Sequence, residues 1–234
     1  ELYNKGVTTL NQIDLEEEVL NPNQVLQIKS ESEGEAFIDE NQIKGFINHL
    51  NYPLYFLDFE TFGPAIPVYN DSRPYQQLVF QYSLHVQNSE DSELIHEEYL
   101  ADPKSDPRVN FVKQLIKNCG SSGDVIVYNM GFERGKLEDL ANVFPEYSDK
   151  LNGIIHRLKD LMIPFQKKWY YTPDMKGSYS IKKVLPALVP DMSYDDLEIK
   201  EGGTASNTFL SMVNGSFKED ENNVRKQLLD YCKL

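Results

Sequence analysis

The stretch YFLDFETFGP, residues 55–64, places two carboxylates at the end of an otherwise apolar and aromatic run. On a β-strand, residues i and i+2 point to the same face with their Cα atoms roughly 6.5 to 7 Å apart, so the side chains of Asp58 and Glu60 would converge. Carboxylates that close repel each other unless a proton, a basic side chain or a divalent cation lies between them. The other interpretation is that the strand ends at Phe59 and both acids lie in a solvated loop.

Composition limits the class of protein. The chain has 234 residues, of which 40% are hydrophobic and 12% aromatic, and no apolar run is long enough to span a bilayer. It shows no signal-peptide pattern, and its two cysteines, Cys119 and Cys232, are too few for a disulfide framework. We therefore expect a soluble, cytoplasmic protein with reduced thiols and no membrane partner.

The charge of the chain is strongly acidic and unevenly distributed. A net charge of −14 argues against broad electrostatic affinity for nucleic acid, because such binding needs phosphate-neutralising lysines and arginines. Residues 1–50 hold ten acids and three lysines, whereas residues 160–183 hold five lysines and two aspartates. Any contact with a polyanion is therefore expected to be local.

Hydrophobic periodicity and turn residues predict the elements of the fold. In chain order these are a helical hairpin at 1–28, an acidic linker at 30–35, a helix at 38–50, strands at 54–59, 78–86 and 94–100, a helix at 107–119, a strand at 125–128, helices at 132–143 and 148–158, a short strand within 159–165, and helices at 181–188, 204–213 and from 219 onward. This order predicts the α/β class, with an RNase H-like mixed sheet in which a three-strand antiparallel meander is joined by parallel strands, and with helices on both faces.

The same pattern predicts the domain organisation. Residues 1–50 are expected to form a helical arm or linker, and residues 51–234 one RNase H-like domain. The chain begins with Glu1 rather than Met, and its last stretch, LLDYCKL, carries no helix stop signal. We therefore expect the second domain to be truncated at its C-terminus.

A second stretch, VIVYNMGFERGKLEDLA at residues 125–141, predicts a strand that runs into a helix. Glu133 lies in the first turn of that helix, where it can aim back across the sheet or simply compensate the helix dipole. Asp160, near the last short strand, is a weaker candidate for a site acid. His156 is interpreted as a helix-surface residue.

Together the two stretches resemble the DEDD superfamily of 3′–5′ exonucleases. Asp58 and Glu60 match its first motif, D-x-E on the first strand. Its second motif is N-x-x-x-F-D; here Asn129 stands three positions before Phe132 instead of four, and Glu133 replaces the Asp.

The third motif of that superfamily is Y-x-x-x-D on the last helix. Tyr231 matches its Tyr, and the Asp would fall directly after Leu234. Without that Asp, we expect this chain to bind metal weakly and to cleave poorly.

The resemblance implies a two-metal site for Mg²⁺ or Mn²⁺ that hydrolyses phosphodiester bonds. Asp58 would bridge both ions, Glu60 would hold the ion that activates water, and Glu133 would act on the second ion through its outer shell. Tyr231 would orient the attacking water.

A closer resemblance covers residues 50–234. The stretches YFLDFET, VIVYNMGFERGKL, GSYSIKKVLPAL and LLDYCKL resemble an uncharacterised bacterial domain family that is usually found downstream of a RecB-type nuclease module. Residues 1–30 would then be the tail of that preceding module, which is an expected partner. This resemblance implies a nuclease fold and supplies no substrate.

Contacts to single-stranded DNA or RNA are expected from two groups of residues. Those beside the carboxylates are Thr61, Phe62, Asn129 and Phe132. In KKWYYTPDMKGSYSIKK, residues 167–183, lysines interleave with aromatic residues as single-strand binding requires, and the candidates are Lys167, Lys168, Trp169 and Tyr179. A core-packing aromatic cluster with solvated lysines explains the second group equally well.

The sequence thus predicts a metal-dependent nuclease that works from the 3′ end of a single strand. The serious alternative is a catalytically inactive RNase H-like domain that binds nucleic acid or protein, in which case Glu133 marks lost activity. A glycoside hydrolase also uses paired carboxylates, but no second strand-end acid and aromatic sugar platform stand in a recognisable order. Metal affinity separates the nuclease from the binding module.

Overall fold

The chain is divided between two units in the computed structural model, which describes residues 2–192, 194 and 197–233. The smaller unit comprises residues 1–49 and 162–193, and the larger comprises residues 50–161 and 194–234. The sequence predicts a single domain over residues 51–234, whereas the structure groups residues 162–193 with the N-terminal residues. The reason is a strand pairing and a small core that the local sequence pattern does not reveal.

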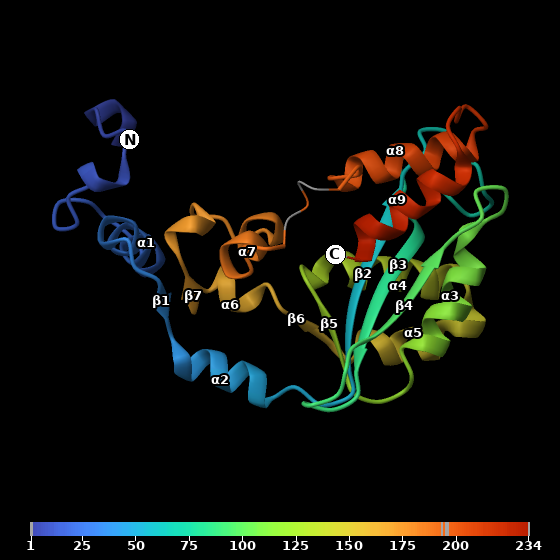
Figure 1. Ribbon diagram of the computed structural model, residues 1–234, viewed down its shortest axis with the longest axis horizontal. Coiled ribbons are helices and arrows are strands. Elements are labelled where there is room, and N and C mark those ends of the chain that lie inside the picture. Colours follow the sequence, from blue (N-terminus) through green and yellow to red (C-terminus); the bar gives the residue numbers. More distant parts are fainter. Residues whose placement is uncertain (1, 193, 195–196, 234) are drawn as a thin grey trace. The chain divides into compact units, whose positions relative to one another are not determined.

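A five-stranded mixed sheet organises the larger unit (Figure 1). Its strands are β2 (Leu54–Phe62), β3 (Leu78–Gln87), β4 (Ile95–Leu100), β5 (Asp124–Val127) and β6 (Leu158–Asp160). They are arranged in the order β4-β3-β2-β5-β6, in which β2, β3 and β4 form an antiparallel meander while β5 and β6 are parallel additions. This confirms the predicted RNase H-like mixed sheet.

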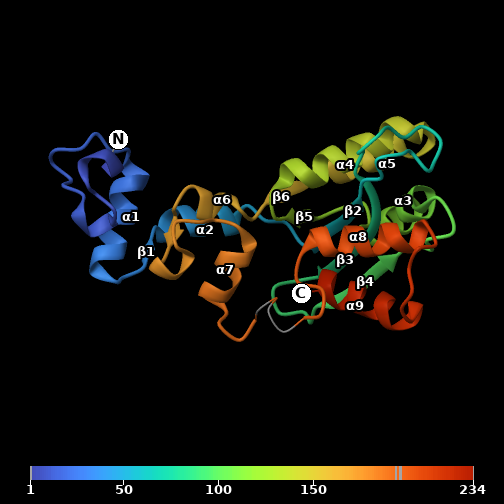
Figure 2. The ribbon, with the colours of Figure 1, turned by 90° about the horizontal axis from the view of Figure 1, so that it is seen from above.

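Helices cover both faces of this sheet, as the element order predicts. Figure 2 shows α8 and α9 on one side of the strands and α4 and α5 on the other. The helices of the larger unit are α3 (Pro107–Asn118), α4 (Met130–Val143), η3 (Pro145–Tyr147), α5 (Ser148–Ile155), α8 (Gly202–Val213) and α9 (Glu221–Lys233). Two separate apolar cores form between the helices and the sheet.

The two cores fix which side chains of β2 point to which face. Leu57 and Phe59 are buried in the core that α3, α4 and α5 cover, while Phe62 is buried in the core that α8 and α9 cover. Because side chains alternate along a strand, Asp58 and Glu60 point to the α8–α9 side. The alternation of β2 therefore sends both carboxylates to one face.

A β-bulge lies beside Glu60. The pairing register of β2 and β3 shifts between Glu60 and Thr61, so that Phe80 on β3 has no partner on β2. The bulge turns Phe80 into the α8–α9 core, where its ring stacks on Phe209 with the centroids 4.1 Å apart. The irregular pairing thus occurs directly at the acid pair.

The smaller unit is mainly helical. Its elements are η1 (Leu2–Lys5), η2 (Leu10–Gln12), α1 (Pro22–Glu33), β1 (Phe37–Ile38), α2 (Glu40–Asn48), α6 (Ile163–Gln166), β7 (Tyr170–Tyr171), η4 (Pro173–Met175) and α7 (Ile181–Leu188). β1 pairs with β7, and Tyr171, Met175 and Val184 form the core. This pairing explains why residues 162–193 join the N-terminal part of the chain.

The acidic linker expected at residues 30–35 is mostly helix. Asn21 caps the start of α1 by accepting a hydrogen bond from the Gln24 amide, and the helix continues to Glu33. It ends at Gly34, whose φ of +70° suits glycine. The prediction of a linker at Ser30–Glu33 is wrong, because the capped start of the helix outweighs its acidic end. No helix among the described residues is long and apolar enough to cross a membrane.

Gly123 offers a test of the packing at the start of β5. Its φ is +80°, and a Cβ added there would lie 2.0 Å from the carbonyl oxygen of Pro53. We expect Gly123→Ala to lower the free energy of unfolding by about 2 kcal/mol or more, because it forces a strained backbone and a displaced neighbour. In the control Gly153→Ala, within α5, no atom lies within 4 Å of the added Cβ, and a gain of up to about 1 kcal/mol is expected. Urea unfolding compares the two, and equal stability would contradict this account.

Candidate functional site

Three potential metal ligands converge on the α8–α9 face of the sheet. A carboxylate oxygen of Asp58, a carboxylate oxygen of Glu60 and Sγ of Cys232 all lie within 4.8 Å of one another. Asp58 and Glu60 come from β2 and Cys232 from the last turn of α9. The predicted convergence of the two acids is therefore found, and the sequence reasoning missed the thiol beside them.

Asp58 and Glu60 lie in different surroundings. Glu60 is buried, with 9% of its surface exposed, whereas Asp58 is exposed to solvent. The protein nevertheless surrounds Asp58 closely enough that desolvation raises the pKa of its carboxyl to about 6, against a smaller lowering by a hydrogen bond from the Phe59 amide. For the approach of an ion the exposure matters more, because water reaches this carboxyl. Asp58 is thus the side of the pair that a solvated cation can reach.

Glu133 is a buried carboxyl without a full set of partners. It lies in the first turn of α4 with 1% of its surface exposed, and its Oε2 has no hydrogen-bond partner among the residues that the structure describes. Burial raises the pKa of its carboxyl to about 8, and the charges of Asp58 and Asp160 add to the shift. Glu133 therefore faces the same acidic region as the β2 pair.

Asp160 positions the start of α4. Its two carboxylate oxygens accept hydrogen bonds from the backbone amides of Asn129 and Met130, each at 3.0 Å. Asn129 has a φ of +76°, a left-handed conformation that Asn tolerates better than most residues. The sequence predicts Asp160 only as a weak candidate for a site acid. In the structure it stabilises the junction between β5 and α4, and Glu133 lies in the first turn of that helix. His156 is exposed at the end of α5.

Tyr231, on α9, is an uncharged and buried neighbour of Glu60. Burial raises the pKa of its hydroxyl, and the charge of Glu60 is the next cause. A Cβ at Gly202, the first residue of α8, would lie 3.5 Å from Oε2 of Glu60 and 3.6 Å from the Tyr231 hydroxyl. The rings of Tyr231 and Tyr194 pack with centroids 5.8 Å apart. The start of α8 therefore lies directly beside Glu60 and Tyr231.

A hollow of about 520 Å³ opens next to Glu60. Its lining comprises Phe59, Glu60, Thr61, Gly63, Tyr75, Gln77, Phe132, Gly202, Gly203 and Ser206. Two of the predicted nucleic-acid contacts, Thr61 and Phe132, are among these residues. Phe62 is not, because it is fully buried in the α8–α9 core, where its ring lies 5.1 Å from that of Phe209. Phe62 is therefore a core residue, and its prediction as a nucleic-acid-binding residue is wrong.

The predicted lysine and aromatic candidates belong to the other unit. The stretch from Lys167 to Tyr179 lies within residues 162–193, whereas the carboxylates lie in the larger unit. Nζ of Lys168 lies 3.8 Å from the ring centroid of Tyr171, which is fully buried. Lys167 and Tyr179 are exposed, and Trp169 is half-buried. The stretch thus combines a core aromatic with exposed lysine and tyrosine side chains.

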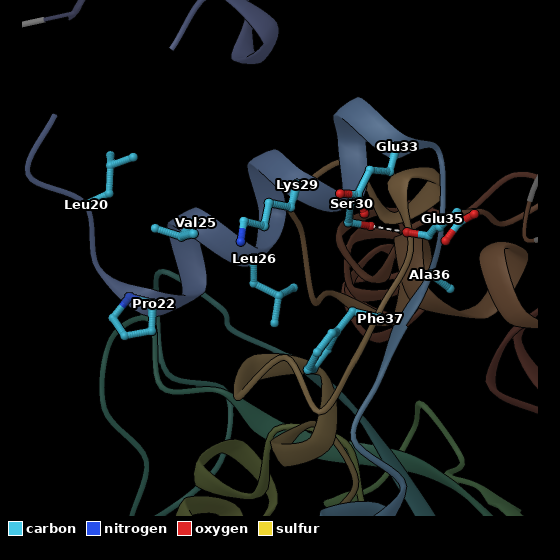
Figure 3. A pocket seen from close by; sticks show the side chains of 10 residues that line it. All are labelled: Leu20, Pro22, Val25, Leu26, Lys29, Ser30, Glu33, Glu35, Ala36 and Phe37. Carbon is cyan, nitrogen blue, oxygen red and sulfur yellow. Dashed lines mark hydrogen bonds between the residues drawn. The ribbon is translucent and has the colours of Figure 1, made fainter. Parts of the chain in front are cut away.

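The smaller unit has a hollow of its own, of about 500 Å³, along α1 (Figure 3). Apolar side chains such as Val25, Leu26 and Phe37 line it together with Lys29 and the backbone-bonded Ser30, whose hydroxyl donates to the carbonyl of Glu35. None of the predicted site residues contributes to this hollow. The predicted metal ligands Asp58, Glu60 and Glu133 all belong to the larger unit.

Comparison with known proteins identifies the family. Residues 55–180 match a family described as a domain of unknown function (DUF2779), and since this is more than half of the chain, the chain belongs to that family. The sequence predicts membership of an uncharacterised bacterial domain family, and this match confirms it. No solved structure matches.

Relatives occur in mycoplasmas and a ureaplasma. The chain is 30% identical over 217 residues to the uncharacterized protein MG366 of Mycoplasma genitalium, covering 85% of the chain and 32% of that protein. It is 28% identical over 211 residues to the MG366 homolog of Mycoplasma pneumoniae, with 82% and 32% covered, and 31% identical over 143 residues to the uncharacterized protein UU173 of Ureaplasma parvum, with 57% and 21% covered. The chain thus spans about a third or less of the length of these relatives.

The buried carboxyl of Glu133 predicts a distinctive pH dependence of stability. Its pKa of about 8 lies above the ordinary value of 4.5, so the folded protein keeps a proton that the unfolded chain releases in this window. The free energy of unfolding should therefore fall as the pH rises from about 5.5 to about 8.5 in the presence of a chelator. Glu133→Gln should remove the part of this fall above about pH 6, the pKa of Asp58, and should be more stable than the natural protein at the alkaline end, by on the order of a few kcal/mol.

Urea unfolding across that pH range tests the prediction. The matched control is Glu138→Gln, which changes an exposed carboxylate of the same helix and should keep the natural pH profile. An unchanged profile in Glu133→Gln would show that this carboxyl is already ionised in the folded protein.

Proposed function

We propose that this domain is a metal-dependent nuclease that hydrolyses phosphodiester bonds from the 3′ end of single-stranded nucleic acid. The observation that carries the proposal is the Oε2 atom of Glu133, which has no hydrogen-bond partner among the described residues and is buried near the place where Asp58 and Glu60 converge. A buried polar atom without a partner costs free energy, so a site that keeps one favours a ligand that would complete it.

The charges around this region favour a cation as that ligand. Every charged group that shifts the pKa of Glu133 is itself an acid, namely Asp58 and Asp160. Clustered carboxylates can stay ionised together when a divalent cation neutralises them, and oxygen donors suit Mg²⁺ or Mn²⁺. Asp58, Glu60 and Glu133 are therefore the residues that would hold metal. When bound, two such ions would activate a water molecule and stabilise the leaving oxygen of a phosphodiester.

Tyr231 is suited to orient water and not to remove its proton. Burial and the charge of Glu60 both raise the pKa of its hydroxyl, so the hydroxyl keeps its proton at neutral pH. A protonated phenol beside Glu60 donates a hydrogen bond, which can fix the position of a water molecule next to the carboxylates. This agrees with the role that the motif resemblance implies for it.

The hollow beside Glu60 suits the terminal nucleotide of a strand. Phe132 and the exposed Tyr75 offer aromatic surface on which a base can stack. Gly202 and Gly203 begin α8, and the amides at the start of a helix favour an anion such as a phosphate. Aromatic side chains and the start of α8 thus both line the hollow beside Glu60, which supports a substrate that is a nucleic-acid end.

The motif resemblance to DEDD exonucleases supports the same reaction. The closer resemblance, to an uncharacterised bacterial domain family that is usually found downstream of a RecB-type nuclease module, bears on the surroundings of the domain. We propose that a RecB-type nuclease module precedes this domain in the full-length protein and that the protein works in the cytoplasm. An accompanying nuclease module would supply or consume the same nucleic-acid ends.

Cleavage of labelled strands tests the proposal. With Mn²⁺ and 5′-labelled single-stranded DNA or RNA, we expect a ladder that shortens from the 3′ end, forms slowly because this chain is expected to cleave poorly, and disappears when the metal is chelated. Asp58→Ala and Glu60→Ala should each lower the rate by at least about a hundredfold, because even groups that only orient a metal ligand contribute about 10- to 100-fold. Glu138→Gln, which changes an exposed acid, should leave the rate unchanged.

Two other results would count against a nuclease. Cleavage that survives Asp58→Ala would place the activity elsewhere, in a contaminant or another site. If the folded protein cleaves neither polymer but retards labelled strands in a gel, the domain is a nucleic-acid binding module.

A further inference from the structure

A thiol lies among the acids of the site although no step of the proposed hydrolysis uses it. Cys232 is 5% exposed, and its Sγ lies within 4.8 Å of carboxylate oxygens of Asp58 and Glu60. Within the described part of the chain, these three residues form the one group of acids, histidines and cysteines close enough to share an ion. The thiol therefore lies where a third metal ligand would be needed.

We propose that Cys232 is a metal ligand and that its sulfur directs this site toward a borderline transition ion, Zn²⁺ or Co²⁺, in preference to Mg²⁺. The inference rests on the metal site of the proposed function and adds to it the class of ion. Thiolates select softer ions, whereas Mg²⁺ is bound by oxygen donors alone. A set of two carboxylates and one thiolate consequently binds Zn²⁺ or Co²⁺ more tightly than Mg²⁺.

A separate observation points to a ligand at the same place. Glu133, on α4, brings a buried carboxyl whose Oε2 has no partner among the described residues, and it lies close enough to Asp58 for the two charges to interact. Its carboxylate offers a fourth ligand from α4, which covers the face of the sheet opposite to α9. Tetrahedral zinc ligands lie roughly 3.3 to 3.8 Å apart, about 1 Å closer than the upper limit of 4.8 Å for the three atoms here, so binding requires the three side chains to move closer together.

The surroundings of the thiol disfavour other roles. The charged groups near Cys232 are Asp58, Glu60 and Glu98, all of them acids, and the thiol is buried beneath them. A thiol in such a place is neither a nucleophile nor a redox sensor, because both need an accessible thiolate. A bound cation reverses this local balance and deprotonates a coordinating thiol.

Cobalt absorption provides a test that does not depend on cleavage. Metal-free protein without a histidine tag is titrated with Co²⁺ under reducing conditions, and a thiolate-to-cobalt charge-transfer band in the near ultraviolet is expected. Cys232→Ser should lose the band, whereas Cys119→Ser should keep it, because Cys119 is buried in the core on the other face of the sheet. Circular dichroism and thermal unfolding establish that both variants are folded.

Calorimetry completes the test with Zn²⁺ and Mg²⁺. Cys232→Ser should lower the affinity for Zn²⁺ by at least about tenfold and leave the affinity for Mg²⁺ little changed. Cobalt that binds the natural protein without a charge-transfer band, or a band that persists in Cys232→Ser, would overturn the inference.

These outcomes separate the inference from the proposed function. If the band is absent but Asp58-dependent cleavage occurs, only the role of Cys232 is overturned. If the band is present and no polymer is cleaved, the metal site stands and the nuclease does not.

Discussion

Burial of β2 between two apolar cores is the constraint on which the rest of the structure depends. Leu57 and Phe59 anchor the strand in one core and Phe62 anchors it in the other, so the strand cannot rotate. Asp58 and Glu60 lie between these anchors and have to face the helices α8 and α9. The apolar packing of the sheet thus holds together two charges that would separate in an unfolded chain.

Placing several acids close together destabilises the fold, and contacts in the surrounding structure offset this cost. Glu133 is buried at 1% exposure, and the helix that carries it is held by the carboxylate of Asp160 at its first amides. The capping contact fixes the direction of α4, so Glu133 cannot relax toward water without loosening the junction. A strained electrostatic arrangement that is supported by its neighbours is typical of functional sites.

The sequence predicts well those features that depend on neighbours in the chain. The strand at β2, the meander that follows it, and the start of α4 all have local hydrophobic and turn patterns, and the shared face of Asp58 and Glu60 follows from strand geometry. The position of Cys232 depends on how α9 crosses the sheet, which no local pattern encodes. Likewise, the placement of residues 162–193 depends on the pairing of Tyr171 with Phe37, far away in the chain.

The packing of α9 on the sheet decides whether the candidate site is complete. Gln81 donates a hydrogen bond to the carbonyl of Leu228 across 147 positions, and Arg225 donates to the carbonyl of Ala101 across 124. Contacts between such distant residues close large loops, which costs conformational entropy. Tyr231 and Cys232 lie one turn beyond Leu228, so both residues belong to the site only while α9 is packed against the sheet.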